Sequence, residues 1–118
     1  MATELQSLPA CINLTLYRGD DWNEVFVYKI DDVAVNMSGG TCEAIFSSAL
    51  NGAPLLTANA TGSKLLCDGS GNITFALDPS DIALLGSRGV YEMRYTDSAG
   101  EIETLFAGRY VIEDDVAV

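Results

Sequence analysis

The sequence predicts an all-β fold, an antiparallel β-sandwich of about seven strands with one short helical turn near residues 79–85. Turn signals recur roughly every ten residues, which is the spacing typical of a sandwich. Between the turns, hydrophobic and polar residues alternate, as they do in strands with one buried face. With 118 residues, of which 48% are hydrophobic, the chain can bury one core without disulfides or metals.

Two strands and a shorter third one open the predicted sandwich. The first covers residues 11–17 and ends at a turn over residues 18–21. The second covers residues 22–30, and both of its faces are largely apolar, which indicates a central strand. A short strand at residues 33–36 follows. The residues expected to face inward from the first strand are Ile12, Leu14 and Leu16.

A β-hairpin is predicted around Asn51-Gly52, because both residue types tolerate the positive φ angles of a type I′ turn. Its two strands cover residues 41–48 and 54–58. Leu50 and Ala53 are therefore expected to face each other across the turn. The residues expected to face inward from the first strand of the hairpin are Cys42, Ala44 and Phe46.

A capped helical turn is predicted in the second half of the chain. Asp78 can cap it, Pro79 suits its first position and Gly86 can end it. Ile82 and Leu85, three residues apart, are expected to close one end of the sandwich. The strands that precede this turn are residues 65–66 and residues 73–77, the latter with Ile73, Phe75 and Leu77 facing inward.

The most regular alternation lies in a long closing hairpin. Its strands cover residues 89–96 and 101–112, and the turn covers residues 97–100. One face of its first strand carries Tyr91, Met93 and Tyr95, and the other carries Glu92, Arg94 and Thr96. A half-buried sheet follows from this segregation.

The chain is strongly acidic. Six lysine and arginine residues stand against seventeen aspartate and glutamate residues, so the formal net charge is −11. Such a charge repels phosphate backbones and anionic lipid headgroups. Moreover, no apolar run approaches the roughly 20 residues that span a bilayer. We therefore expect no nucleic acid and no membrane among the partners of this protein.

The residue inventory argues against catalysis. Histidine is absent, which removes the commonest general base and the commonest transition-metal ligand. The acidic pairs at residues 20–21 and 31–32, and the run at residues 113–115, lack the ligand spacing of a calcium loop. We therefore expect a protein that is not an enzyme, with no catalytic residue, no cofactor and no metal.

The three cysteines, Cys11, Cys42 and Cys67, are far apart in the sequence and odd in number. They form neither a paired disulfide framework nor a Cys-x-x-Cys metal site. Each stands in or beside a predicted strand, so we expect all three to occupy core positions as small hydrophobic residues.

Two further motifs invite a binding hypothesis. Arg18-Gly19-Asp20 matches an integrin-type tripeptide, but a turn at a strand end often produces this tripeptide by chance, so we interpret it as a turn. Tyr17, Trp22 and Tyr110 are aromatic residues that, if exposed, could stack on a sugar ring. A carbohydrate-binding module is therefore a hypothesis of a different class, although the alternation around Trp22 favours a place in the core.

Six segments carry a resemblance to a known family. They are residues 14–22 (LTLYRGDDW), 35–39 (VNMSG), 71–75 (GNITF), 80–85 (SDIALL), 89–97 (GVYEMRYTD) and 104–112 (TLFAGRYVI). Their order resembles that of bacteriophage virion domains with an immunoglobulin-like β-sandwich, namely the N-terminal domain of phage baseplate upper proteins and small tail or neck structural proteins. Residues 36–38 (NMS) depart from the Asp-Leu-Thr that is usual in that family.

The resemblance implies a non-enzymatic bacteriophage structural protein, a tail or baseplate adaptor component that docks onto a symmetric virion assembly. It implies a virion location after synthesis in the host cytoplasm, with other virion proteins and further copies of the same chain as partners. A capsid decoration, or cement, protein is an alternative of the same kind.

The expected organisation is a single sandwich domain between two short terminal segments. Residues 1–10 form an N-terminal arm that is expected to become ordered on assembly, residues 11–113 form the β-sandwich domain, and residues 114–118 form a C-terminal tail. The candidate assembly interface consists of Leu5, Leu8, Pro9, Glu113, Asp114 and Asp115.

Overall fold

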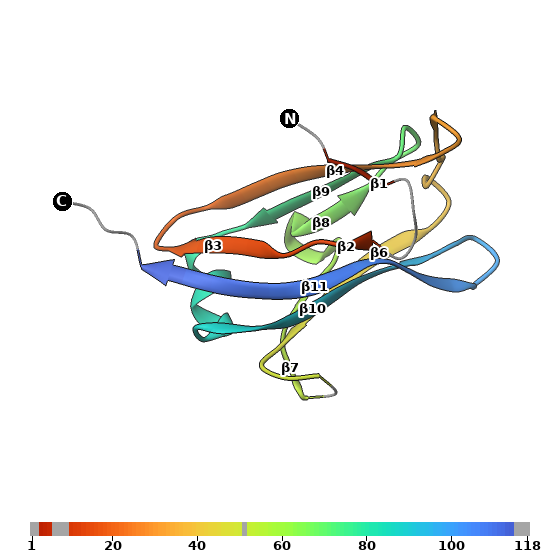
Figure 1. Ribbon diagram of the computed structural model, residues 1–118. Helices are drawn as coiled ribbons and strands as arrows, with labels where there is room; N and C mark the ends of the chain where they lie inside the picture. The colour runs from red at the N-terminus through yellow and green to blue at the C-terminus, as the bar shows by residue number, and fades with distance from the viewer. Residues whose placement is uncertain (1–2, 6–9, 51, 115–118) are drawn as a thin grey trace.

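Two β-sheets pack face to face in the computed structural model, which describes residues 3–5 as backbone and residues 10–50 and 52–114 with their side chains (Figure 1). The first sheet contains β1 (Thr3–Leu5), β4 (Trp22–Ile30), β9 (Asn72–Leu77) and β8 (Leu65–Cys67) in that order, with β5 (Val33–Ala34) paired to β4. The second contains β2 (Ala10–Cys11), β11 (Ile102–Asp114), β10 (Arg88–Thr96), β6 (Thr41–Ser47) and β7 (Pro54–Ala58) in that order, with β3 (Leu14–Arg18) paired to β11. The predicted all-β sandwich is confirmed.

Strand length separates the main strands from marginal ones. Of the eleven strands in the described part of the chain, seven have five residues or more, which matches the number that the alternation predicts. The others, β1, β2, β5 and β8, have two or three residues each and lie at the margins of the sheets. The helical segments are η1 (Thr61–Ser63), α1 (Pro79–Ile82) and η2 (Ala83–Leu85).

Three strand pairings are parallel, although the sequence predicts antiparallel sheets. β1 runs parallel to β4, and both β2 and β3 run parallel to β11. Only strands joined by a tight turn must be antiparallel, and none of these pairs is joined in that way. β3 leads into β4 of the other sheet through a turn in which the Tyr17 carbonyl accepts the Asp20 N–H at 3.2 Å. The Arg-Gly-Asp tripeptide forms this crossing, with Gly19 at φ +90°.

The predicted first strand is interrupted between β2 and β3. The Ile12 N–H still donates to the Ala107 carbonyl at 2.9 Å, but the next acceptor in the ladder is the Asn13 side chain, whose Oδ1 accepts the Arg109 N–H at 3.0 Å. Gly108 allows this close approach, because a Cβ atom there would lie 2.1 Å from the Ile12 carbonyl oxygen. The alternation therefore locates the strand, but its break depends on the partner strand.

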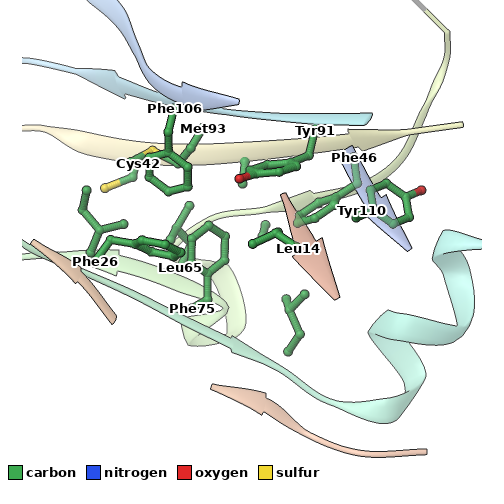
Figure 2. Packing of buried hydrophobic residues seen from close by; sticks show 14 of the residues in the cluster. Leu14, Phe26, Cys42, Phe46, Leu65, Phe75, Tyr91, Met93, Phe106 and Tyr110 are labelled. Atoms are coloured by element: carbon green, nitrogen blue, oxygen red, sulfur yellow. The ribbon is translucent and has the colours of Figure 1, made fainter. Parts of the chain in front are cut away.

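The core lies between the two sheets and is rich in aromatic rings (Figure 2). The ring centroids of Phe26 and Phe106, which come from opposite sheets, are 4.7 Å apart, and those of Phe46 and Tyr91 are 5.5 Å apart. Most residues predicted to face inward are buried, which confirms the alternation; they are Leu14, Leu16, Cys42, Ala44, Phe46, Ile73, Phe75, Leu77, Tyr91, Met93 and Tyr95.

A β-bulge places two consecutive hydrophobic residues of β11 in the core. Met93 of β10 pairs with Phe106, whereas its neighbour Arg94 pairs with Thr104, so Leu105 is the additional residue. Leu105 and Phe106 are both fully buried. The inward-facing residues of β11 therefore alternate in one phase before the bulge and in the opposite phase after it.

The capped helical turn is confirmed. The Asp78 carboxylate accepts the Asp81 N–H and the Asp81 carboxylate accepts the Asp78 N–H, both at 3.0 Å. Pro79 occupies the start of α1, and Ile82 and Leu85 are fully buried. These two side chains cover one end of the core, as predicted.

The predicted two-residue turn at Asn51-Gly52 is wrong. The ladder between β6 and β7 stops where Ser47 pairs with Pro54, so the connection covers residues 48–53. The Gly52 N–H donates to the Ala49 carbonyl at 2.9 Å, and Leu50 is 80% exposed. A turn with two positive φ angles occurs instead between β4 and β5, at residues 31–32. Asn51 lies outside the described residues.

The cysteines do not all occupy the core. Cys42 is buried and Cys67 is half-buried, but Cys11 is exposed at the end of β2. The prediction of a core position is therefore wrong for Cys11. The reason is that Cys11 lies on a two-residue strand at the sheet margin and pairs with Ala107, which faces away from the core.

Candidate functional site

The structure places the predicted interface residues in different regions. The backbone of Leu5 lies in β1, opposite Tyr28 of β4. Leu8, Pro9 and Asp115 lie outside the described residues. Glu113 and Asp114 form the end of β11 and pair with the end of β3, so the last strand extends one residue beyond the predicted domain boundary at 113.

An ion pair joins the ends of these two parallel strands. Arg18 Nε lies 2.9 Å from Asp114 Oδ1, and the two side chains are 46% and 83% exposed. A surface pair of this kind contributes about 0–1 kcal/mol to stability. It therefore orients the strand ends more than it stabilises them.

Two exposed hydrophobic side chains lie beside this ion pair. Tyr17 of β3 is 49% exposed and Val111 of β11 is 38% exposed. The parallel register places Thr15 beside Val111 and Tyr17 beside Glu113, all on the face of the sheet that points away from the core. We call this set of four residues, Thr15, Tyr17, Val111 and Glu113, the Tyr17–Val111 surface.

A groove of about 730 Å³ lies farther along the outer face of the same sheet. Its floor is formed by outward-facing residues of β6, β10 and β11, among them Ile45, Val90 and Ala107. Ala49 and Leu50 of the connection between β6 and β7 form one wall. Its charged side chains are Glu92 and Arg109, and the exposed Cys11 thiol lies at the same groove.

A second hollow of about 350 Å³ lies near the other end of the outer face. Arg94 contributes to it and lies between two acids: its Nη2 is 3.3 Å from Glu43 Oε1, and its Nε is 3.7 Å from Glu92 Oε1. Ile102, which is 64% exposed, lines the same hollow. The outer face therefore combines apolar side chains with compensated charges, a composition suited to contact with another protein.

No constellation for metal binding is present in the described part of the chain. There, no group of three or more cysteine, aspartate or glutamate side chains converges as a metal site. Across the same residues, no helix combines the length and hydrophobicity that a membrane span requires.

The three aromatic residues considered for sugar binding do not form one platform. Tyr17 is exposed, but Trp22 is half-buried with its ring centroid 5.0 Å from that of Phe75. Tyr110 is fully buried, so its ring is not available to stack on a sugar. Its hydroxyl donates to the Leu85 carbonyl, which satisfies the polar group inside the core.

Sequence analysis missed one pair of residues. Cys42 of β6 and Cys67 of β8 come from opposite sheets, and the proximity of the Cys67 thiol adds to the effect of burial, the larger cause, in raising the pKa of the Cys42 thiol. Their separation in the sequence gives no sign of this proximity, because it depends on how the two sheets pack.

Comparisons with known proteins identify the fold. A scan against protein-family models finds no match, and a search of curated proteins finds none either. Among solved structures, the N-terminal domain of phage TP901-1 ORF48 is similar, with a TM-score of 0.56 and 10% sequence identity. The match covers 95% of this chain and 96% of the other. The chain therefore shares, over nearly its whole length, the fold of a phage protein domain.

Proposed function

We propose that this protein is a non-enzymatic structural component of a phage particle, a tail or baseplate adaptor that docks onto a symmetric assembly. The observation that carries the proposal is the similarity in fold, over 95% of the chain, to a domain of a phage protein. The order of turns and strands, which resembles the N-terminal domain of baseplate upper proteins, supports the same assignment from the sequence.

The ends of β3 and β11 supply a docking surface for this role. β3 pairs with β11 alone among the described strands, so its other edge has no strand partner there, and we propose that a strand of a partner adds to it. The Tyr17–Val111 surface adds exposed apolar area beside that edge. Other virion proteins and further copies of the chain are the proposed partners, since symmetric assemblies bring identical surfaces together repeatedly.

The absence of histidine supports a role without catalysis. The net charge of −11 supports protein partners rather than nucleic acid, because an acidic domain is repelled by phosphate backbones. The function is therefore proposed to lie in surface recognition.

The test is to locate the chain in purified particles of the phage that encodes it. We expect cryo-electron microscopy to show the sandwich at the tail or its tip, in a copy number set by the rotational symmetry of the tail. Density distributed over the shell, with a copy number that follows the capsid lattice, would indicate a decoration protein instead. A chain found in infected-cell lysates but absent from particles would contradict both roles.

A further inference from the structure

The edge strands of this protein differ in how well they are protected against pairing. Among the described strands, β1, β2, β5 and β8 have two or three residues each, and β7 begins with Pro54 and forms an irregular ladder with β6. β3 has five residues in continuous register with β11 and contains no proline. Its one charged residue, Arg18, stands at its end and binds Asp114 of β11. Short length, proline and bulges usually protect an edge, so the side of β3 away from β11 has the properties of a pairing site (Figure 1).

Two main-chain hydrogen bonds show how β3 is oriented. The Ile12 N–H, just before β3, donates to the Ala107 carbonyl of β11 at 2.9 Å. The Ile112 N–H of β11 donates at 2.8 Å to the Ser87 carbonyl, which precedes β10 and so lies on the side away from β3. Main-chain groups along a strand point alternately to its two sides, so both bonds indicate that the even-numbered residues of β3 bind β11. The odd-numbered residues therefore direct their N–H and C=O groups to the open edge.

Thr15 and Tyr17 are these odd-numbered residues, and their side chains are exposed. Among the described residues, no hydrogen bond occupies the Thr15 N–H, the Thr15 carbonyl or the Tyr17 N–H. The Tyr17 carbonyl accepts the Asp20 N–H at 3.2 Å and retains a second lone pair. The edge therefore presents the two donors and two acceptors that an antiparallel strand requires for two hydrogen-bonded residue pairs.

We propose that β3 pairs in the antiparallel direction with β3 of a second copy of this chain, about a twofold axis at Leu16. Thr15 of each copy then lies opposite Tyr17 of the other, and each of these two pairs exchanges two N–H···O=C bonds. Leu16 lies opposite Leu16 on the core side, and the six-stranded sheets of the two copies become continuous. The inference rests on the proposed function, since it names the occupant of the edge that serves there as a docking surface.

The charge distribution favours a second copy at this edge. The net charge of −11 makes the acidic surfaces of two copies repel each other. Residues 12–18 (INLTLYR) contain no carboxylate, and the charge of Arg18 is compensated by Asp114. This edge therefore offers no opposite charge to a basic partner, whereas two copies of it meet without like charges in direct opposition. In the proposed register, the facing residues at Thr15, Leu16 and Tyr17 are all uncharged.

The experiment measures association of the full chain in solution, with a reductant present so that the exposed Cys11 does not link two copies. Sedimentation equilibrium from about 10 μM to about 1 mM should fit a monomer–dimer equilibrium. Amide exchange measured by NMR should slow at Thr15 and Tyr17 as the concentration rises, because their N–H groups become bonded. Leu14 and Leu16 are internal controls, since their N–H groups face β11 in the monomer as well. Added salt should strengthen the dimer, because it screens the repulsion between two acidic chains.

Substitutions at Thr15 test the edge directly. Thr15→Pro removes the outward N–H and should raise the dissociation constant of the dimer by about tenfold or more. The Tm should change little, because no described residue accepts that N–H. Thr15→Val is the matched control, since it keeps the N–H and the branched shape and should dimerise normally. Should proline prevent folding, Thr15→Glu tests the same edge: the added carboxylates should weaken the dimer at low salt, and high salt should restore it.

A chain that stays monomeric over this concentration range would overturn the pairing. A dimer that Thr15→Pro and Thr15→Glu leave intact, or one that forms without slower exchange at Thr15 and Tyr17, would overturn it as well. Dissociation of the dimer by salt would indicate a contact held by ion pairs and would also contradict the proposal. None of these results bears on the place of the chain in phage particles, which microscopy of the particles decides separately.

Discussion

The hydroxyl of Tyr110 donates a buried hydrogen bond of 2.8 Å to the main-chain carbonyl oxygen of Leu85. It joins β11 to η2 through two residues that are 25 positions apart in the sequence. The closing strand is thereby attached to the helical segment that covers one end of the core. A buried carbonyl group at a helix end needs such a partner, because water does not reach it.

Replacement of Tyr110 by phenylalanine should therefore lower the free energy of unfolding by about 1–3 kcal/mol, since it leaves the Leu85 carbonyl without this donor. Urea unfolding followed by fluorescence measures the change. Tyr17→Phe is the matched control. Tyr17 is 49% exposed, so removal of its hydroxyl should change the free energy of unfolding by no more than about 0.5 kcal/mol. Equal effects of the two substitutions would contradict the assigned role of the Tyr110 hydroxyl.

Gly108→Ala should destabilise the protein by about 2–4 kcal/mol, because the new Cβ atom would lie 2.1 Å from the Ile12 carbonyl oxygen. The expected response is a displacement of the segment between β2 and β3, with faster amide exchange at Arg109, whose N–H donates to Asn13. Hydrogen exchange by NMR reports that local change. Gly39→Ala is the control, since its nearest neighbour is the movable Ser98 side chain at 3.3 Å. If Arg109 exchange stayed as slow as in the natural protein, the proposed clash would be refuted.

Acid should weaken the cap of α1. Hydrogen bonds from the Ser80 hydroxyl, the Lys64 ammonium group and the Asp81 N–H hold the pKa of Asp78 well below its usual value. A lowered carboxyl pKa stabilises the fold above the unfolded-state value of about 3.9, and this stabilisation is lost as the pH falls through the folded-state value. The Tm should therefore fall more steeply below about pH 4 in the natural protein than in Asp78→Asn.

Thermal unfolding monitored by circular dichroism between about pH 6 and pH 2 compares these variants over the window in which Asp78 takes up a proton in the unfolded chain but stays ionised in the folded protein. Lys64→Met should give an intermediate slope, because Lys64 Nζ lies 2.9 Å from Asp78 Oδ2 and 2.6 Å from Asp81 Oδ2. Protonation of the other carboxylates acts on all the variants, so only the difference between slopes is informative. Parallel curves for the natural protein and Asp78→Asn would rule out the contribution of the cap.

The proposed docking role predicts that substitutions on the Tyr17–Val111 surface impair assembly into particles but leave folding intact. Tyr17→Ser combined with Val111→Ser should strongly reduce incorporation into phage particles, while the Tm changes by only a few degrees because both side chains are exposed. Complementation of a phage that lacks the gene, followed by quantification of the chain in purified particles, measures incorporation. Leu84→Ser is the control, since Leu84 is 55% exposed but lies on η2. Normal incorporation of the double variant would remove the Tyr17–Val111 surface from the proposal.

Much of the candidate surface could not be predicted from the sequence. The alternation in β11 identifies outward-facing residues such as Val111. Which side chains lie next to them depends on the parallel pairing with β3. Of the predicted interface residues, Glu113 and Asp114 take part in that pairing, whereas Leu8 and Pro9 lie outside the described residues. From the sequence, Tyr17 and Tyr110 are both candidates for an exposed aromatic side chain, yet Tyr17 is exposed and Tyr110 is fully buried.

Local periodicity and capping chemistry by themselves determined the strands, their inward faces and the helical turn that begins after Asp78. Only the tertiary structure decided the bulge at Leu105 and the parallel course of β3 along β11. The physical reason is that a two-residue period of hydrophobic residues in the sequence indicates which face of a strand is buried. The choice of partner strand and register depends instead on packing between residues that are distant in the sequence.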